Sequence, residues 1–327
     1  MKKNKITTIL VMLTLIITLM IVGSNEVLSE NDVYPSKPIT LIAPAGPGGT
    51  FDIMARIVSS TAGDFFGVPL VVRNLPGASF TLGTEALAKS APDGYTLEVA
   101  SPTPFAFAPL TVGTSYDPLN DFEYIANIGT GLMAIGVHKG LPFKTFDELL
   151  EHAKEYPGEI TVASSGGLVN MWVKILGEMG YKFSIVPFPG AAPAAVAVGG
   201  GHVDVNMGSL ASCLGLAQSG DIRILCILPN IEGLKSPLEG VPTINEFPEI
   251  QKALGVIGKS PYGVYGPKGI PEERLQIIEE NLYKAFQSEA FQGMMKRVGI
   301  EPLWLGREEY TEDMYEYISI VAKYYEE

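Results

Sequence analysis

Short apolar stretches alternate with amphipathic stretches along almost the whole chain beyond its N-terminal region. ITLIAPA (39–45) is typical of a short buried strand, and the segment after it repeats apolar residues such as Ile53 and Ile57 at helical spacing. The same order of strand, glycine turn and helix returns at 159–165 and 168–179. Apolar strands that alternate with helices predict an α/β architecture with mostly parallel sheets.

The remaining pattern extends this alternation to the C-terminus. Thr145 and Glu148 form a capping box that predicts the start of a helix. The Pro- and Gly-rich stretch 229–248 is predicted to cross between two lobes. Further strands are predicted at 69–74, 95–101, 123–139, 183–188, 203–209, 222–228 and 256–266, and further helices at 81–89, 145–155, 191–199, 210–219, 271–288, 289–298 and from 307 onward.

Two strand–glycine–helix junctions, at 44–52 and 163–170, look equivalent. In open α/β sheets, ligands bind beyond the carboxyl ends of the strands. A helix that begins there presents unpaired backbone N–H groups and a partial positive charge, and glycine lets a ligand approach that backbone closely. Two such turns facing each other would bind both ends of a dicarboxylate without Lys or Arg.

The net charge of the chain limits the classes of molecule that it can be expected to bind. The formal net charge is −13, from 36 acidic and 23 basic side chains. Nonspecific nucleic-acid binding depends on basic side chains, so we expect no nucleic acid. An acidic surface also repels anions at long range, so an anion site has to be built locally. Three histidines and two cysteines offer few ligands for a zinc site, and we expect no metal and no cofactor.

The N-terminus has the pattern of an export signal. Lys2, Lys3 and Lys5 precede an uncharged, mostly apolar run at 6–23. We interpret residues 1–29 as a signal peptide or a retained N-terminal anchor, which places the rest of the chain in the periplasm or at the outer face of the cytoplasmic membrane. Outside the cytoplasm a disulfide is permitted. Cys213 and Cys226 both lie in apolar surroundings, so a disulfide and two buried thiols remain open alternatives.

Several enzyme motifs fail on inspection. Gly46 begins a stretch like the dinucleotide-binding pattern G-x-G-x-x-G, but Phe51 stands where the third glycine belongs. GKS at 258–260 resembles the end of a P-loop without its first glycine, and neither H-E-x-x-H nor G-x-S-x-G occurs. Ser164 and Ser165 have no histidine nearby in the sequence. An exported hydrolase using one of these serines is therefore the weaker alternative to a ligand-binding role.

Seven segments, taken in order, resemble one family of proteins: YPSKPITLIAPAGPGGTFDIMAR, VVRNLPGASFTLGTEALAKSAPDGYTL, YDPLNDFEYIANIG, LPFKTFDELLEHAKEYPGEITVASSG, GGGHVDVNMGSL, GVPTINEF and YGPKGIPEERLQ. The resemblance is to the extracytoplasmic solute-binding receptors of tripartite tricarboxylate transporters, the Bug or TctC-like receptors. It covers the chain from Tyr34 to about Tyr310.

The resemblance implies a type II periplasmic-binding-protein fold with two α/β lobes and a ligand cleft between them. We expect one lobe at 34–130 plus 233–327 and the other at 131–232, with hinges near 129–133 and 229–236. The implied function is capture of a small organic anion, a carboxylate above all, and its delivery to a membrane permease with large and small subunits. We expect the receptor to be a monomer. A sensory receptor for the same ligands is the alternative.

The resemblance also implies where the ligand is held, namely the loop after the first strand and the matching loop of the second lobe. Turn and strand-end residues near these loops are further candidates. Phe51 either packs on the ligand or staples the start of its helix, and both roles remain open. Asp52 either contacts the ligand or is a structural residue at the start of the helix. For the neighbouring turn residues, ligand contact and turn chemistry are both open. The candidate ligand-binding residues are Gly48, Gly49, Thr50, Phe51, Asp52, Ser101, Thr103, Ser164, Ser165, Gly166, Gly167, Asn170, Gly190 and Ser209.

The identity of the ligand stays open among succinate-like, citrate-like and aromatic carboxylates and an uncharged solute. The family usually has Lys where Pro189 stands, and it commonly has Thr or Trp where Phe51 stands. Both differences favour a less charged or partly apolar ligand.

Overall fold

The computed structural model describes residues 33–188, 190–228 and 235–326. The strands and helices that the structure describes all lie within residues 37–327, which form one compact unit. The predicted signal or anchor at 1–29 lies outside the described residues. Among the helices that the structure describes, none is both long and apolar enough to cross a membrane.

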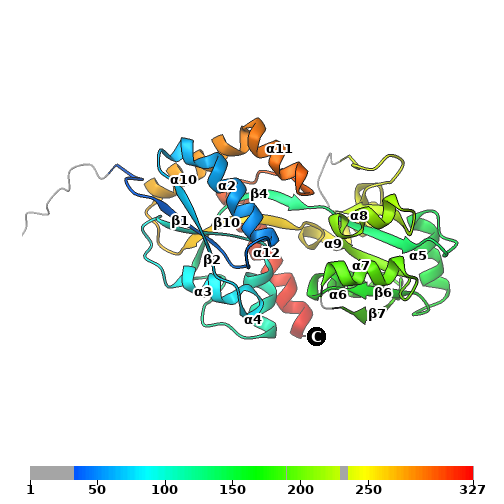
Figure 1. Cartoon of the computed structure of the whole chain (residues 1–327). Helices are drawn as coiled ribbons and strands as arrows, with labels where there is room; N and C mark the ends of the chain where they lie inside the picture. Colours follow the sequence, from blue (N-terminus) through cyan, green and yellow to red (C-terminus); the bar gives the residue numbers. More distant parts are fainter. Residues whose placement is uncertain (1–32, 189, 229–234, 327) are drawn as a thin grey trace, which may run out of the picture. The chain divides into compact units, whose positions relative to one another are not determined.

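Figure 1 labels the elements of this unit. The strands are β1 (Ile39–Ala43), β2 (Leu70–Asn74), β3 (Thr96–Ala100), β4 (Phe122–Gly131), β5 (Met133–His138), β6 (Thr161–Ser164), β7 (Ser184–Pro187), β8 (Val205–Ser209), β9 (Ile222–Leu228), β10 (Pro261–Pro267) and β11 (Ile300–Glu301). The α-helices are α2 (Thr50–Phe66), α3 (Thr81–Ala88), α4 (Ala108–Thr111), α5 (Phe146–Glu155), α6 (Gly167–Glu178), α7 (Ala191–Gly199), α8 (Leu210–Gln218), α9 (Pro248–Leu254), α10 (Glu272–Gln287), α11 (Glu289–Arg297) and α12 (Arg307–Glu326). The short turns are η1 (Ala78–Phe80), the π-helical η2 (Thr103–Phe107), η3 (Ile244–Glu246) and η4 (Gly255–Gly258).

The first sheet has the strand order β11-β4-β10-β3-β1-β2. β1 is parallel to both β2 and β3. The crossover from β1 to β2 moves toward one edge of the sheet, and the crossover from β2 to β3 moves back toward the other edge. Because such crossovers are right-handed, α2 and α3 cover opposite faces (Figure 1). α10 and α11 pack against α2, whereas α12 contributes to the buried cluster on the side of α3.

The second sheet has the strand order β7-β6-β8-β5-β9. β6 is parallel to β7 and β8, so α6 and α7 also lie on opposite faces by the same argument. Alternate residues of its strands belong to two separate buried clusters: Ile135 and Val162 lie in the cluster with α6, and Ala134 and Ala163 in the cluster with α7 and α8.

Both sheets are mixed, which differs from the expectation of mostly parallel sheets. β10 runs antiparallel to β3 and β4, and β5 runs antiparallel to β8 and β9. The cause is the crossing of the chain between the sheets. β4 passes into β5 through Leu132 alone, and β10 brings the chain back to the first sheet, so these strands are not joined by helical crossovers within one sheet.

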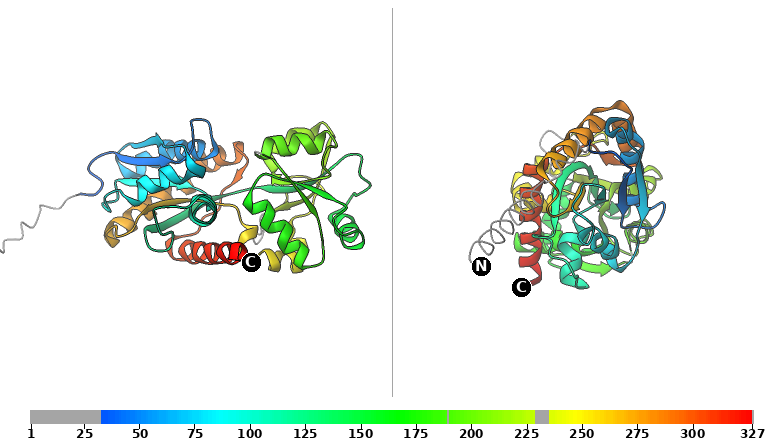
Figure 2. Two further views of the ribbon diagram at one scale, coloured as in Figure 1. Left: turned by 90° about the horizontal axis from the view of Figure 1, so that it is seen from below. Right: turned by 90° about the vertical axis from the view of Figure 1, so that its left-hand side faces the viewer.

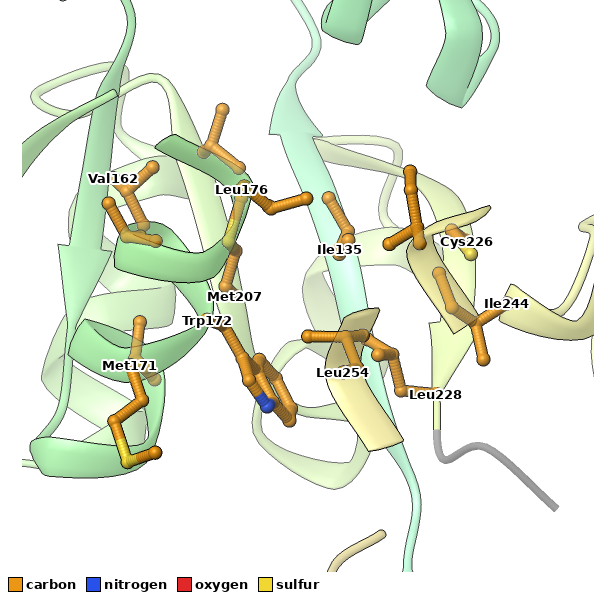
Figure 3. Packing of buried hydrophobic residues seen from close by; sticks show 14 of the residues in the cluster. Ile135, Val162, Met171, Trp172, Leu176, Met207, Cys226, Leu228, Ile244 and Leu254 are labelled. Atoms are coloured by element: carbon orange, nitrogen blue, oxygen red, sulfur yellow. The ribbon is translucent and has the colours of Figure 1, made fainter. Parts of the chain in front are cut away.

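The core beside α6 joins segments that are far apart in the sequence. Trp172 donates its indole N–H to the carbonyl of Ile257 at 3.1 Å, and Ile244 and Leu254 pack in the same cluster (Figure 3). Tyr317 of α12 also belongs to this cluster, and Figure 2 shows the end of α12 beside the segment near residue 250. The region 244–257 therefore packs with the second sheet. The boundaries that we expect between the lobes stay a prediction.

Most predicted elements agree with the structure to within one or two residues. α7 occupies 191–199 as predicted, and the capping box of Thr145 and Glu148 at the start of α5 is confirmed. α9 was not predicted. It is short, begins with Pro248, and lies in a stretch whose Pro and Gly content predicts a crossing segment.

The two cysteines are free thiols, and both are buried. Cys213 lies in the cluster with α7 and α8, whereas Cys226 lies in the cluster on the opposite face of the second sheet. The sheet between them explains why no disulfide forms. Burial raises the pKa of the Cys213 thiol to about 11, so it is unreactive at neutral pH.

Candidate functional site

The loops that carry the candidate residues follow the carboxyl ends of parallel strands, as predicted. In the first sheet, the turns after β2, β1 and β3 come to one edge. In the second sheet, the turns after β7, β6 and β8 come to one edge in the same way. This is the place where open α/β sheets bind ligands.

The first glycine loop is tied together by its own hydrogen bonds. Gly48 has φ +81°, which favours glycine, and its N–H donates to Oδ2 of Asp52 at 2.8 Å. The N–H of Gly49 donates to the carbonyl of Gly46 at 3.0 Å. These two amides therefore hold the loop rather than stand open to a ligand.

Asp52 is the centre of this loop, and its side chain is 4% exposed. Arg56 donates to its Oδ2 at 3.0 Å, and the amide of Asn74 donates to its Oδ1 at 2.9 Å and to the carbonyl of Ala45 at 2.9 Å. The hydrogen bond from Arg56 above all, helped by those from Gly48 and Asn74 and opposed by burial, lowers the pKa of Asp52 to about 2.

Sequence reasoning missed Arg56 and Asn74. The spacing of Asp52 and Arg56, four residues apart in a helix, is a signal that could have found the ion pair. Asn74, at the end of β2, carries no such signal, because its contact with Asp52 spans 22 positions of sequence.

No side chain caps the backbone N–H groups in the first turn of α2. Its N-cap is Gly49, which has no side chain to cap the helix. The N–H groups of Thr50, Phe51 and Asp52 have no acceptor within the helix, because the first N–H groups of any α-helix lack a partner one turn earlier. These amides supply a local positive pole in a protein of net charge −13.

Aromatic rings stand beside this first turn. Phe51 is 7% exposed, and its ring centroid lies 5.0 Å from that of Phe80 in an edge-to-face arrangement and 6.2 Å from that of Tyr262. Phe80 and Tyr262 are half-buried. Neither was a candidate residue in the sequence, since only the fold brings these three segments together.

A left-handed turn carries Phe80. Ala78, Ser79 and Phe80 have φ values of +45°, +54° and +76°, a region that residues other than glycine seldom occupy. The hydroxyl of Thr81 donates to the carbonyl of Ala78 at 2.8 Å and fixes the turn. The turn, η1, packs against η2, which begins at Thr103.

Ser101 and Thr103 are joined to each other. The hydroxyl of Ser101 donates to Oγ1 of Thr103 at 3.0 Å, and the N–H of Thr103 donates back to Oγ of Ser101 at 3.3 Å. Both residues are half-buried. The pair closes the turn after β3 and lies at the same sheet edge as the loop after β1.

The loop after β6 is organised by a side-chain pair. The hydroxyl of Ser164 donates to Oδ1 of Asn170 at 2.6 Å, and the N–H of Gly166 donates to Oγ of Ser164 at 3.3 Å. Gly166 is exposed with φ +150°, and no side chain caps α6. The N–H groups of Gly167 and the two residues after it thus have no acceptor within the helix, like those that begin α2.

No histidine of the described residues is hydrogen-bonded to Ser164 or Ser165. His138 contacts the carbonyl of Val198, and His152 lies near Glu159. A serine nucleophile needs a general base within hydrogen-bond reach. The arrangement gives the hydrolase alternative no support.

Gly190 and Ser209 begin the two other helices at the edge of the second sheet. Gly190, with φ +157°, is the N-cap of α7, and Ser209 is the N-cap of α8, where its carbonyl accepts a hydrogen bond from the Ser212 hydroxyl at 2.7 Å.

The loop after β6 also lies near elements of the first sheet. A Cβ placed on Gly167 would be 2.8 Å from Cδ1 of Phe107 and 3.1 Å from the hydroxyl of Tyr325, so a side chain there would push against η2 and α12.

Comparison with known proteins identifies the family. The model of the "Tripartite tricarboxylate transporter family receptor" matches residues 54–318. Protein BugT of Bordetella pertussis is 31% identical over 83% of this chain and 83% of its own length. The UPF0065 protein in the gbd 5'region of Cupriavidus necator is 28% identical over 87% of this chain and 85% of its own.

Solved structures agree with this match. A TctC solute-binding protein from Polaromonas is similar with a TM-score of 0.74 and 26% identity, over 89% of this chain and 99% of that one. An R. palustris protein solved with adipate has a TM-score of 0.69 and 26% identity, over 89% of this chain and 98% of that one. The predicted two-lobe α/β fold of periplasmic binding proteins is confirmed, and the chain belongs to the family of tripartite tricarboxylate transporter receptors.

Proposed function

We propose that this protein is an extracytoplasmic receptor that binds a small organic acid between its two lobes and delivers it to a membrane permease with large and small subunits. Membership in a family of transporter receptors supports a transport role over a sensory one. The related R. palustris protein solved with adipate supports an organic acid as the ligand class. The export pattern at 1–29 supports a location outside the cytoplasm.

The observation that carries this proposal is the open first turn of α2. The N–H groups of Thr50, Phe51 and Asp52 lie beyond the carboxyl end of β1, with no capping side chain. A carboxylate group accepts hydrogen bonds from such amides and is favoured by the helix dipole. Gly48 and Gly49, whose amides are bonded within the loop, then serve by letting the ligand come close to the backbone.

The second lobe would contribute the matching first turn of α6. Ser164, Asn170 and the N–H of Gly166 hold that loop in shape. We assign ligand contacts there to Ser165, Gly166 and Gly167. The turns at Ser101–Thr103, Gly190 and Ser209 complete the candidate set.

Closure of the two lobes around the ligand would follow from its greater affinity for the closed form. We place one hinge at 129–133, where β4 passes into β5. The second hinge, at 229–236, includes residues outside the described part of the chain. The lobe limits in this proposal are 34–130 with 233–327, and 131–232, and the segment 244–257 of the first lobe packs against the second.

The first test is a thermal-shift and calorimetric screen of the purified protein against adipate, succinate, citrate and benzoate. A ligand present at about 100 times its Kd stabilises the fold by about 2.7 kcal/mol, which raises the melting temperature by a measurable amount. Recovery of the acid unchanged, checked by NMR, is expected of a receptor. No response to any of these acids would contradict the proposal.

The second test removes one backbone donor without breaking the helix. Thr50→Pro deletes the N–H at the first position of α2, where proline is well tolerated, and Gly49 already has the extended ψ of 161° that a following proline requires. Loss of one hydrogen bond to a charged group predicts binding that is about tenfold weaker.

Thr50→Ala is the matched control, because it removes the side chain and keeps the amide. Calorimetry should show near-normal affinity for this variant. Equal affinity in the Pro and Ala variants would mean that the first amide of α2 does not bind the ligand.

A further inference from the structure

The fold presses α3 against the first glycine loop. A Cβ placed on Gly83 would lie 2.7 Å from Cβ and 2.9 Å from Cα of Pro44, so glycine is needed for this close approach. The approach carries Phe80, which directly precedes α3, to the first turn of α2. There its ring meets that of Phe51 edge to face, with 5.0 Å between the centroids.

The backbone under Phe80 adopts a conformation that disfavours its side chain. φ is +76° at Phe80 and follows two other left-handed residues that are not glycine, Ala78 and Ser79. A bulky side chain makes φ above zero unfavourable, whereas glycine adopts it freely. The fold thus holds the ring of Phe80 in this position although the backbone conformation that places it is unfavourable for a residue with a bulky side chain.

The basic side chain of α2 is already paired with an acidic one. Arg56 is the basic residue of the first turns of α2, and its guanidinium is paired with Asp52 at 2.9 Å. Tyr262 adds a third ring, and its phenol is neutral because burial raises its pKa to about 12. A group of the ligand that lies here meets aromatic carbon and a neutral hydroxyl beside the amides of α2.

From this juxtaposition, and resting on the proposed function, we propose that Phe80 is a specificity-determining residue and that the preferred ligand is a carboxylate attached to an aromatic or similarly apolar body. The α2 amides bind the carboxylate, and the half-buried rings of Phe80 and Tyr262 pack on the body over the buried Phe51. A second charged group packed against these rings would meet aromatic carbon in place of a hydrogen-bond partner.

The test compares benzoate with adipate by calorimetry in the wild-type protein and in Phe80→Gly. Glycine accepts φ +76°, so the variant removes the ring while relieving the backbone. The expected results are at least about tenfold tighter binding of benzoate than of adipate by the wild-type protein, and about a tenfold loss for benzoate against less than about twofold for adipate in the variant.

Ala78→Gly is the matched control, since it relieves the same kind of left-handed residue and leaves the rings in place. Its ratio of benzoate to adipate affinity should equal that of the wild-type protein. Phe80→Asn is the second ring-deleting variant, because asparagine tolerates this conformation, and it should repeat the selective loss. Melting temperatures near that of the wild-type protein will show that both ring-deleting variants fold.

The failures are distinguishable. Binding of adipate or citrate in preference to benzoate, or an unchanged benzoate affinity in folded Phe80→Gly and Phe80→Asn, overturns the role of Phe80 and leaves the receptor function standing. Binding of none of these acids by the wild-type protein overturns the receptor function itself.

Discussion

Asp52 illustrates how the charge of an acidic residue can be compensated beside a helix start that we propose binds an anion. Its carboxylate is paired with Arg56 and accepts hydrogen bonds from Gly48 and Asn74, so its charge is compensated within the loop. Of the two roles that the sequence left open, these contacts support that of a structural residue at the helix start. The result is a fixed loop that leads directly into the first turn of α2, where no side chain caps the backbone N–H groups.

Glu98 is a second acidic residue whose environment decides its charge. It lies in the middle of β3 with 0% exposure, and one carboxyl oxygen accepts a hydrogen bond from Thr84 at 2.7 Å while the other has no partner among the described residues. Burial, opposed by the bond from Thr84, raises the pKa of Glu98 to about 8. The residue is therefore mostly a neutral acid at pH 7.

This buried acid predicts a pH-dependent cost in stability. Below pH 4.5, the ordinary pKa of glutamate, the carboxyl is protonated in both the folded and unfolded chains. As the pH rises toward 8 the unfolded chain releases the proton first, so the folded state loses stability by up to about 1.4 kcal/mol for each pH unit. Above about pH 8 the cost is constant.

Glu98→Gln removes this cost and keeps the acceptor for Thr84. Denaturant melts should show nearly equal stability of the variant and the wild-type protein at about pH 4, and a variant more stable by several kcal/mol at about pH 8. Glu316→Gln, on the exposed face of α12, is the charge-matched control and should lack this profile. A constant difference between Glu98→Gln and the wild-type protein across this pH range would show that Glu98 is ionised in the fold.

At the scale of elements, the position of α3 depends on Gly83, because this residue has no side chain. Helix propensity alone disfavours Gly83, because glycine costs about 1 kcal/mol relative to alanine inside a helix. The contact with Pro44 reverses this preference, because the space that a Cβ needs is occupied by backbone. The same contact sets the distance between η1 and the glycine loop.

Gly83→Ala is expected to destabilise the protein by about 1–3 kcal/mol and to weaken ligand binding, because α3 has to move away from the loop. Gly177→Ala, in α6, is the matched control: no atom lies within 4 Å of a Cβ placed there, so helix propensity should stabilise it by about 0.5–1 kcal/mol. Urea melts measure both. Stabilisation of the two variants alike would contradict the close packing of α3 on Pro44.

At the scale of the whole molecule, the acidic surface and the proposed anion site act on an organic anion in opposite directions. The net charge of −13 repels an organic anion at a distance, and the α2 and α6 amides that we propose as its binding groups attract it only at short range. Salt screens the long-range part over about 10 Å at 0.1 M and leaves hydrogen bonds at contact largely unaffected.

We therefore expect the association rate constant for an acid found in the screen to rise between about 10 mM and 300 mM salt, with little change in the dissociation rate. Stopped-flow measurement of tryptophan fluorescence, or of a competing reporter ligand, checks this. An association rate that falls with salt would mean that a positive field around the site extends beyond contact distance.

Much of this protein was predictable because the signals are local. Helical spacing, glycine turns and the capping box of Thr145 and Glu148 depend on residues within a few positions of each other, and they located α2, α5 and α7. The ordered segments from Tyr34 to about Tyr310 also identified the family. The placement of the candidate loops at the carboxyl ends of parallel strands follows from the same local pattern.

What only the tertiary structure decided depends on residues far apart in the sequence. The directions of β5 and β10 follow from how the chain crosses between the sheets. The pairing of Asn74 with Asp52 joins β2 to α2, and the approach of Phe80 to Phe51 requires α3 to pack on Pro44. Local preferences determine which segments are strands and helices, whereas burial and close packing select which of them meet, and here that selection outweighs the cost of three left-handed residues.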